Sequence, residues 1–315
     1  MVSQKEQKTS SVQQLIANSR NHKTKKIVEK AMPTLLFSAA VLSILTTFGI
    51  VFTLIFETFE FFKRVSITDF LFGTEWLPFS GKEQLFGIWA LIAGTLKVTL
   101  IATIVAVPFG IGSAIFLSEY ANEKTRRIVK PVLEVLAGVP TIVYGFFALT
   151  FVTPLLQELV PSLKLFNALS PGIVVGVMIL PMITSLSEDA MSSVPNSMRE
   201  GALALGATKF EVAIKVVLPA ALSGIISSVV LAVSRAIGET MIVSLAGGAT
   251  PKFNFNVTDS IQTMTAYIVQ VSSGDAGYGT TIYYSIYSVG FTLFIFTLAM
   301  NLLAQYISKR FREVY

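Results

Sequence analysis

The sequence has 315 residues and contains no cysteine and only one histidine, His22. Without cysteine the chain has no disulfide framework, no thiol nucleophile and no thiolate metal site. His22 stands in a polar, basic stretch, where a lone imidazole is expected to be solvated. We therefore expect no catalytic residues and no metal site in this chain.

Charged residues are also scarce. They make up 14% of the chain, against about 25% in a soluble domain. A helix that crosses a bilayer needs roughly 20 apolar residues. Six stretches meet this need, at about 33–56, 97–118, 131–156, 171–190, 220–246 and 282–307. The sequence predicts an all-α integral membrane protein with six transmembrane helices, the first of them too long for the apolar part of a cleaved signal peptide.

The second apolar region is longer than one span requires, since it runs from Leu85 to Leu117. We expect a short helix on the outer surface, with Trp89 at the lipid headgroups, and a span that starts near Lys97. Lys97 would then extend its ammonium group to the outer interface. A buried lysine with a function is the alternative.

Basic residues are distributed unevenly between the connections. The N-terminal tail holds seven, residues 119–130 hold four, residues 191–219 hold three and the C-terminus holds three, which makes 17 on one side against five on the other. Lysine and arginine concentrate on the cytoplasmic side of membrane proteins. This predicts a multi-pass membrane protein with both termini in the cytoplasm, and a basic tail facing anionic lipid and binding no nucleic acid.

A phosphate-cradling loop is missing as well. Gly81-Lys82 is followed by Glu83, whereas the nucleotide-binding motif requires Ser or Thr at that position. If ATP drives this protein, a partner must bind the ATP and its Mg²⁺.

The cytoplasmic connection 191–219 reads as two short helices around a break. Ser197 with Glu200, and Thr208 with Glu211, have the spacing of capping boxes. Gly206 is suited to end the first helix because glycine accepts a left-handed conformation. An apolar stripe and a proline for the first turn of the fifth span follow, at Phe210, Ala213, Ile214, Val217 and Pro219.

This connection resembles the EAA loop of ABC importer permeases. The matching positions are Glu200, Gly201, Ala202, Gly206, Val216, Leu218 and Pro219. Gly201 replaces the usual alanine and Val216 the usual isoleucine, and both changes keep the residue character. The resemblance implies that Glu200 to Pro219 docks on an ATPase subunit. The alternative, that Glu200 only caps a helix and Gly206 only ends it, is compatible with docking.

Three further segments resemble the permease subunits of bacterial phosphate importers. They are Ser118 to Ala121, Leu136 to Gly145 and Ser234 to Met241. The acidic outer segment 57–84 favours the PstC type. The resemblance implies a type I ABC importer permease fold, and as partners a second, PstA-like permease, a PstB-like ATPase dimer, a PstS-like extracytoplasmic phosphate-binding protein and, as a further possibility, a regulatory protein.

Arg235 is the physical argument for an anion. It lies sixteen residues past Pro219, near the middle of the fifth run, and Glu239 follows one helical turn later. A central arginine costs roughly 2.5–3.5 kcal/mol to insert, so it is expected to face a pathway or a partner charge. The resemblance implies that Arg235 and Glu239 belong to the phosphate pathway. A structural ion pair is the alternative. Hydroxyls at Thr141, Tyr144, Thr184, Ser185 and Ser244 are further candidates.

The expected organisation is a basic tail at 1–30, a first helix with an outer segment at 31–84, a permease core at 85–310 and a cytoplasmic end at 311–315. The expected function is the transmembrane subunit of an ATP-driven phosphate importer, and it is not enzymatic. A permease for molybdate or sulfate would have the same loop. An ion-coupled carrier would instead show internal repeats and several intramembrane carboxylates.

Overall fold

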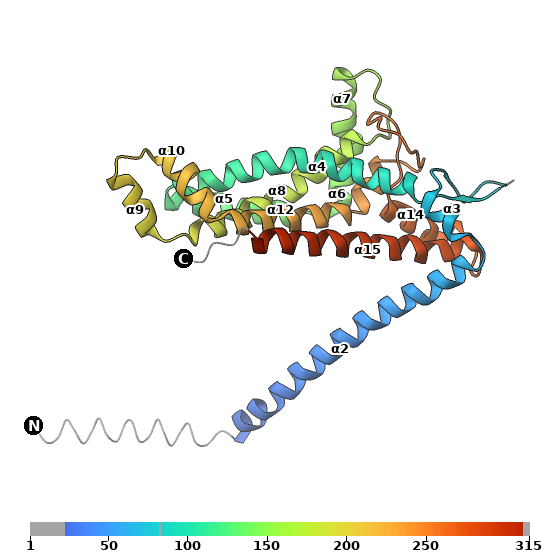
Figure 1. The fold of residues 1–315 in the computed structure, drawn as a ribbon, viewed down its shortest axis with the longest axis horizontal. Helices are drawn as coiled ribbons and strands as arrows, with labels where there is room; N and C mark the ends of the chain where they lie inside the picture. The colour runs from blue at the N-terminus through green and yellow to red at the C-terminus, as the bar shows by residue number, and fades with distance from the viewer. Residues whose placement is uncertain (1–22, 82, 311–315) are drawn as a thin grey trace, which may run out of the picture. The chain divides into compact units, whose positions relative to one another are not determined.

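The computed structural model describes residues 23–81 and 83–310 (Figure 1). Contacts divide the chain into two units, Met1–Leu54 and Ile55–Tyr315. His22, most of the predicted tail and the predicted end at 311–315 lie outside the described residues. Helix α2, Lys23–Phe62, contains the predicted span 33–56 and continues six residues into the predicted outer segment.

The second unit is mostly helical. Between α2 and the middle of the chain it contains α3 Ile67–Phe72, β1 Trp76–Leu77, β2 Leu85–Phe86, α4 Trp89–Ile115, η1 Phe116–Tyr120, α5 Glu123–Gly138, α6 Thr141–Phe147, η2 Ala148–Val152, α7 Thr153–Leu159 and α8 Leu169–Ser192. The second half contains α9 Asn196–Ala204, α10 Lys209–Val212, η3 Ala213–Val217, α11 Leu218–Ala220, α12 Leu222–Ile237, α13 Met241–Ala246, α14 Met264–Gln270, η4 Val271–Asp275 and α15 Thr281–Arg310. The η segments are π-helical turns.

Among the described residues, five helices are long and apolar enough to cross a membrane. They are Ala31–Phe62, Trp89–Tyr120, Thr141–Leu159, Leu169–Ser192 and Thr281–Ile307. A sixth is reached if Lys209–Ala220 and Leu222–Ile237, which meet at 72°, count as one broken span. The prediction of an all-α membrane protein is confirmed.

Two predicted spans have different limits. The run 131–156 is split, because α5 ends at Gly138 and a new helix begins at Thr141, after Pro140. The α5 helix carries charges at Glu123, Lys130 and Glu134 among others, so its sequence suits a polar surface on one side. The run 220–246 is interrupted between α12 and α13.

The predicted surface helix ahead of Lys97 is wrong. Helix α4 is continuous from Trp89 to Ile115, and its backbone passes through Lys97 without a break. The indole N–H of Trp89 donates to the carbonyl of Leu71, at 2.7 Å. The first turn of α4 is thus held by α3.

Helices α4 and α8 form the centre of this unit, and Figure 1 shows them running side by side. Glycine makes their close approach possible. A Cβ added at Gly172 would lie 2.7 Å from Cβ of Ile101, and one at Gly176 would lie 2.9 Å from Cβ of Val105. Around this contact the core is filled by small and branched residues such as Ala102, which has no exposed surface.

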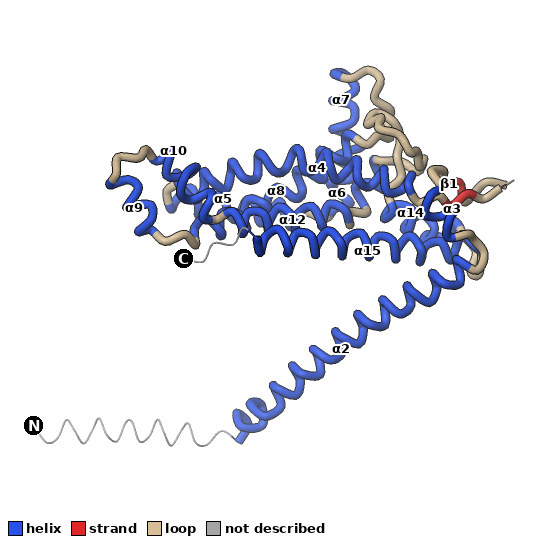
Figure 2. The backbone as a smooth tube through the Cα atoms, viewed as in Figure 1, coloured by secondary structure: helices blue, strands red, loops and turns tan. Residues whose placement is uncertain are grey.

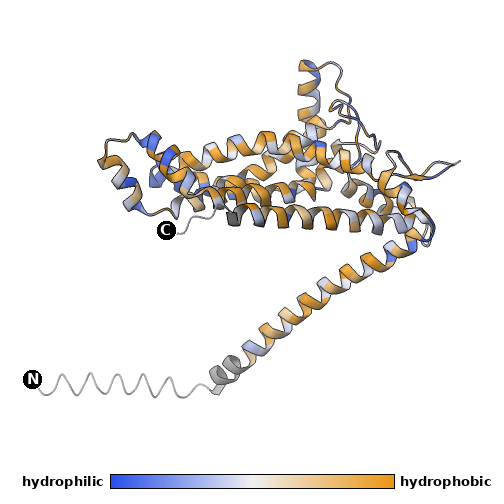
Figure 3. Ribbon diagram, in the orientation of Figure 1, coloured by the Kyte–Doolittle hydropathy of each residue, from blue (hydrophilic) through white to orange (hydrophobic). Residues whose placement is uncertain are grey.

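The two ends of the second unit differ. We call them the α3 end, with α3, β1, β2 and α14, and the α9 end, with α9 and α10; Figure 1 places them at opposite ends of the long helices. The α3 end contains an aromatic cluster in which Trp76 packs edge-on against Phe86 and Tyr267. The strands there are two residues long and antiparallel (Figure 2). At the α9 end, Figure 3 shows hydrophilic residues gathered on α9 and α10, in contrast to the apolar long helices.

Candidate functional site

The loop that resembles the EAA motif is folded as two helices around a glycine. Helix α9 ends at Ala204, and Gly206 follows with φ of 88°, the left-handed conformation expected for it. The second capping box is present: Thr208 accepts from the Glu211 backbone N–H, and the Glu211 carboxylate accepts from that of Thr208.

The first predicted capping box is wrong. Helix α9 begins at Asn196, after the extended residue Pro195, and no side chain caps it. Ser197 therefore lies inside the first turn, and Glu200 lies two residues beyond Met198, which holds the position that a capping-box glutamate would need. The side chain of Asn196 is engaged elsewhere, because it accepts a hydrogen bond from Arg199 at 3.2 Å.

The EAA-like positions divide between an exposed and a packed set. Glu200, Gly201, Gly206 and Pro219 are exposed, whereas Ala202, Val216 and Leu218 pack against one apolar cluster with Met191 and Val212. Beyond them the tip of the loop exposes apolar side chains. Leu203 is 44% exposed, Leu205 91% and Phe210 66%. The predicted stripe is therefore split, since Ala213 and Val217 are buried while Phe210 faces outward.

Arg199 is a residue of this site that the sequence did not point to. Its guanidinium group donates to both carboxylate oxygens of Glu119, in η1, with Nη2 3.1 Å from Oε1. It also donates to the backbone carbonyls of Met191, at 2.7 Å, and Val194. One side chain thus connects α9 with the end of α4 and the end of α8. Glu119 stands in one of the segments that resemble phosphate permeases, which was the available hint.

A second ion-pair cluster lies at the same end. The carboxylate of Glu188, near the C-terminus of α8, has no exposed surface and forms ion pairs with Arg126 and Lys130 of α5. Lys130 also reaches Asp189, at 3.3 Å. Burial lowers the pKa of the Lys130 ammonium group, but its bonds to Glu188 and Asp189 outweigh burial and leave this pKa above its ordinary value. A carboxylate at the end of the predicted span 171–190 was the sequence sign of this cluster.

Arg235 and Glu239 do not share a helix face. Helix α12 ends at Ile237, and the Glu239 carboxylate accepts from the backbone N–H groups of Met241 and Ile242, at 3.0 and 3.2 Å. Glu239 is 8% exposed and caps α13, whereas Arg235 is exposed. Within the part of the chain that the structure describes, no ion pair joins the two residues. The predicted spacing fails because the helix breaks between them.

Three of the five candidate hydroxyls donate to backbone carbonyls. Tyr144 donates to Leu136 at 2.8 Å, Thr184 to Gly110 at 3.3 Å and Ser244 to Thr240 at 2.7 Å. Helix α6, which carries Tyr144, lies against α13: a Cβ added at Gly145 would lie 3.2 Å from Cα of Ile242.

Lys97 is buried, with 9% of its surface exposed, and its ammonium group donates to the amide oxygen of Asn254 at 3.0 Å. Asn254 belongs to the loop after α13, which also carries Asp259. Lys164 binds Asp259 at 2.6 Å, and this hydrogen bond holds the pKa of the Asp259 carboxyl below its ordinary value. The loop thus bonds to α4 and to the segment ahead of α8.

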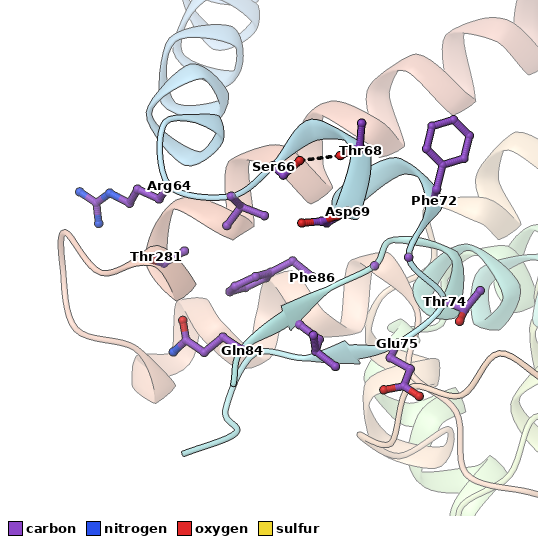
Figure 4. A pocket seen from close by; sticks show the side chains of 14 residues that line it. Arg64, Ser66, Thr68, Asp69, Phe72, Thr74, Glu75, Gln84, Phe86 and Thr281 are labelled. Carbon is purple, nitrogen blue, oxygen red and sulfur yellow. Dashed lines mark hydrogen bonds between the residues drawn. The ribbon is translucent and has the colours of Figure 1, made fainter. Parts of the chain in front are cut away.

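A hollow of about 710 Å³ lies at the α3 end (Figure 4). Its lining carries both signs of charge, with Arg64 on one side and Asp69 and Glu75 on the other. Arg64 also donates to the carbonyl of Gly279 at 2.7 Å. Nothing in the sequence pointed to this hollow beyond the acidic character of the segment 57–84.

Comparison with known sequences identifies a family. Residues 106–313 match the model of the binding-protein-dependent transport system inner membrane component. The chain is 37% identical over 246 residues to the probable ABC transporter permease protein YqgH of Bacillus subtilis, covering 78% of this chain and 79% of that one. It is 32% identical over 292 residues to the phosphate transport system permease protein PstC of Mesorhizobium japonicum, covering 87% and 88%. With the protein of the same name from Xylella fastidiosa strain 9a5c it shares 34% identity over 257 residues, covering 75% and 77%.

Solved structures agree on the fold. A bacterial ABC transporter involved in the import of the acidic polysaccharide alginate matches with a TM-score of 0.63 at 16% identity, over 92% of this chain and 99% of that one. The inward-facing MetNI methionine ABC transporter matches with a TM-score of 0.53 at 19% identity, over 72% and 95%. The fold is that of a type I ABC importer permease, and the chain belongs to the family of binding-protein-dependent transport system inner membrane components.

Proposed function

We propose that this chain is a membrane-spanning subunit of an ATP-driven phosphate importer and forms half of its translocation pathway. The observation that carries the proposal is the 32% identity to a phosphate permease over 87% of the chain. In this assignment a second, PstA-like permease completes the pathway and a PstS-like protein delivers phosphate from outside. A PstB-like ATPase pair binds ATP and Mg²⁺.

The α9 end is assigned to the cytoplasm, where the ATPase subunits are. Its support is the excess of basic residues in the tail and in the connections 119–130 and 191–219. The exposed Leu203, Leu205 and Phe210 are a second support, because apolar side chains exposed together on a polar loop mark an interaction site. ATP-driven closure of the ATPase pair would move this loop, and the helices would alternate between outward- and inward-facing states.

Arg235 is assigned to the phosphate pathway. Its guanidinium group is exposed at the end of α12, next to the break before α13, and its planar fork matches phosphate oxygens. Glu239 has a different part in this assignment. It fixes the start of α13 beside the arginine and does not neutralise it.

The test is phosphate uptake by vesicles that contain the whole complex. We expect Arg235→Gln to lower ATP-dependent uptake about 10- to 100-fold, the loss of a charge-assisted hydrogen bond of about 1.5–3 kcal/mol. Arg127→Gln is the matched control, since Arg127 is 82% exposed on α5 and, among the residues that the structure describes, pairs with the exposed Glu123 alone.

Normal uptake by Arg235→Gln, at equal expression and assembly, would remove Arg235 from the pathway. If the parent complex moved molybdate or sulfate and no phosphate, the substrate assignment would be wrong while the permease family would stand.

A further inference from the structure

Arg199 stands directly before Glu200, at the start of the EAA-like motif, but the two side chains differ in exposure. Glu200 is exposed, whereas the side chain of Arg199 is only 16% exposed and that of Glu119 only 9%. Leu203, four residues after Arg199 on the same helix, is 44% exposed, whereas Arg199 contacts Glu119 and Ala202 packs against the apolar cluster. A force that a docked partner applies to α9 can reach the long helices through these buried contacts.

The contacts of Arg199 reach two long helices. Glu119 lies in the π-turn that continues α4, and both of its carboxylate oxygens accept from the guanidinium group. Met191 lies in the last turn of α8 and Val194 just beyond it. The Met191 carbonyl accepts from the backbone N–H of Val194 and from Arg199, and the Val194 carbonyl accepts from Arg199. Arg199 thus joins both helices to α9.

Other connections of α9 to this body are less directional. The chain between α8 and α9 is three residues long, and the packing of Ala202 against the apolar cluster fixes no orientation. A bidentate guanidinium–carboxylate pair does fix one, because its two parallel hydrogen bonds constrain both planes. The pair is therefore the directional contact between α9 and the end of α4.

We propose that the Glu119–Arg199 pair is the positioning contact that carries the movement of α9 to α4 and α8. This inference rests on the proposed function, in which α9 docks on an ATPase. Without the carboxylate charge, α9 still docks and ATP is still hydrolysed, but the movement is no longer passed on to the helices. The predicted defect is uncoupling.

The first experiment measures phosphate uptake and ATP hydrolysis by the same vesicles containing the whole complex. Glu119→Gln keeps the size of the side chain and one oxygen acceptor but removes its charge. We expect phosphate moved per ATP to fall about tenfold, the loss of one charge-assisted hydrogen bond, while hydrolysis stays within about twofold of the parent. Arg127→Gln, which breaks an exposed pair on the neighbouring α5, should leave the ratio unchanged. An unchanged ratio in Glu119→Gln, or an equal fall in uptake, hydrolysis and assembly, would overturn the proposal.

The second experiment needs no substrate. The chain has no cysteine, so Ser197→Cys in α9 and Phe116→Cys in η1 give two defined positions for spin labels in a complex whose other subunits lack cysteine. Both side chains replaced are exposed. We expect the same distance between the labels with and without bound nucleotide, and a broadened distance distribution when Glu119→Gln is added.

A distance that changes with nucleotide in the parent would overturn the proposal, and so would an unchanged distribution in Glu119→Gln. If the parent complex moved no phosphate, the proposed substrate would fail, but the label distances and ATP hydrolysis would still decide on the pair.

Discussion

Two arginines in this chain can be compared by whether they form an ion pair with a glutamate, and only one of them does. Arg235 and Glu239 are four residues apart and do not pair, because α12 ends between them. Arg199 and Glu119 are 80 residues apart and form a partly buried bidentate contact. Spacing in the sequence predicts a contact only where the helix is continuous. The charges that do meet are brought together by the packing of α4, α8 and α9.

The largest effect is expected where a buried carboxylate, that of Glu188, loses the cations that the fold brings to it from α5. Arg126→Gln with Lys130→Gln leaves Glu188, which has no exposed surface, without either cation. We expect a loss of about 3–5 kcal/mol in the free energy of unfolding, the cost of an uncompensated buried charge. The measurement is thermal or denaturant unfolding of the purified protein in detergent.

The matched control is Lys124→Gln with Arg127→Gln, which removes the same charge from the exposed side of α5 and should cost less than about 1 kcal/mol. Adding Glu188→Gln to the variant Arg126→Gln with Lys130→Gln should recover most of the lost unfolding free energy. If the two double variants were equally stable, the Glu188 cluster would not be a stabilising contact.

A smaller loss of stability is expected on changing Glu239. Its size tests whether Glu239 caps α13 or forms an ion pair with Arg235. Glu239→Ala removes the acceptor of two backbone N–H groups, and we expect it to cost about 1–2 kcal/mol. Glu239→Gln keeps an oxygen in place and should cost less. Unfolding of the purified protein in detergent measures both.

If Glu239 paired with Arg235 instead, Arg235→Gln would destabilise the protein as much as Glu239→Ala does. We expect Arg235→Gln to leave the free energy of unfolding within about 0.5 kcal/mol of the parent, as is usual for an exposed side chain that forms no cap and no buried ion pair. Equal losses of unfolding free energy in Arg235→Gln and Glu239→Ala would be evidence that the two residues form an ion pair.

The smallest effect concerns pH. The pKa of Lys130 is raised in the folded protein, so its pairing with Glu188 and Asp189 stabilises the fold fully below the unfolded value of about 10.4. This contribution is lost as the pH rises through the folded pKa. We expect Lys130→Met to remove about 1 kcal/mol or less of alkaline pH dependence, measured by unfolding between about pH 8 and 11.5.

Parallel curves for the parent and Lys130→Met above about pH 10.4 would contradict the raised pKa. Arg127→Gln serves as the control, since arginine stays protonated throughout this range.

Local patterns predicted local structure well. The runs 97–118, 171–190 and 282–307 lie within continuous helices, and Gly206 and the box from Thr208 to Glu211 have the conformations their residue types favour. These features depend on apolar length, on the tolerance of glycine for positive φ and on hydrogen bonds over three residues. All three can be read from neighbouring residues.

Two of the failures, at Lys97 and at Arg199, involve residues that are distant in the sequence. The start of the second span was misplaced because Lys97 has a partner 157 residues away, Asn254, which no local pattern shows. The break after Ile237 was missed because Glu239 prefers the N–H groups of α13 to Arg235. Arg199 was overlooked because the groups that accept its hydrogen bonds, among them Glu119 after α4 and Met191 in α8, are not its neighbours in the sequence.

The π-turn from Phe116 to Tyr120 has a consequence for how related sequences should be aligned. A π-turn contains one residue more than an α-turn, and one residue corresponds to a rotation of about 100° around the helix axis. Glu119 lies in this turn, so the direction in which its side chain meets Arg199 depends on the extra residue. In a relative one residue shorter at this point, the helix would be regular and the aligned glutamate would face another direction. A single-residue gap in an alignment at this turn would therefore indicate that α9 contacts the end of α4 differently, even where the surrounding motifs are identical.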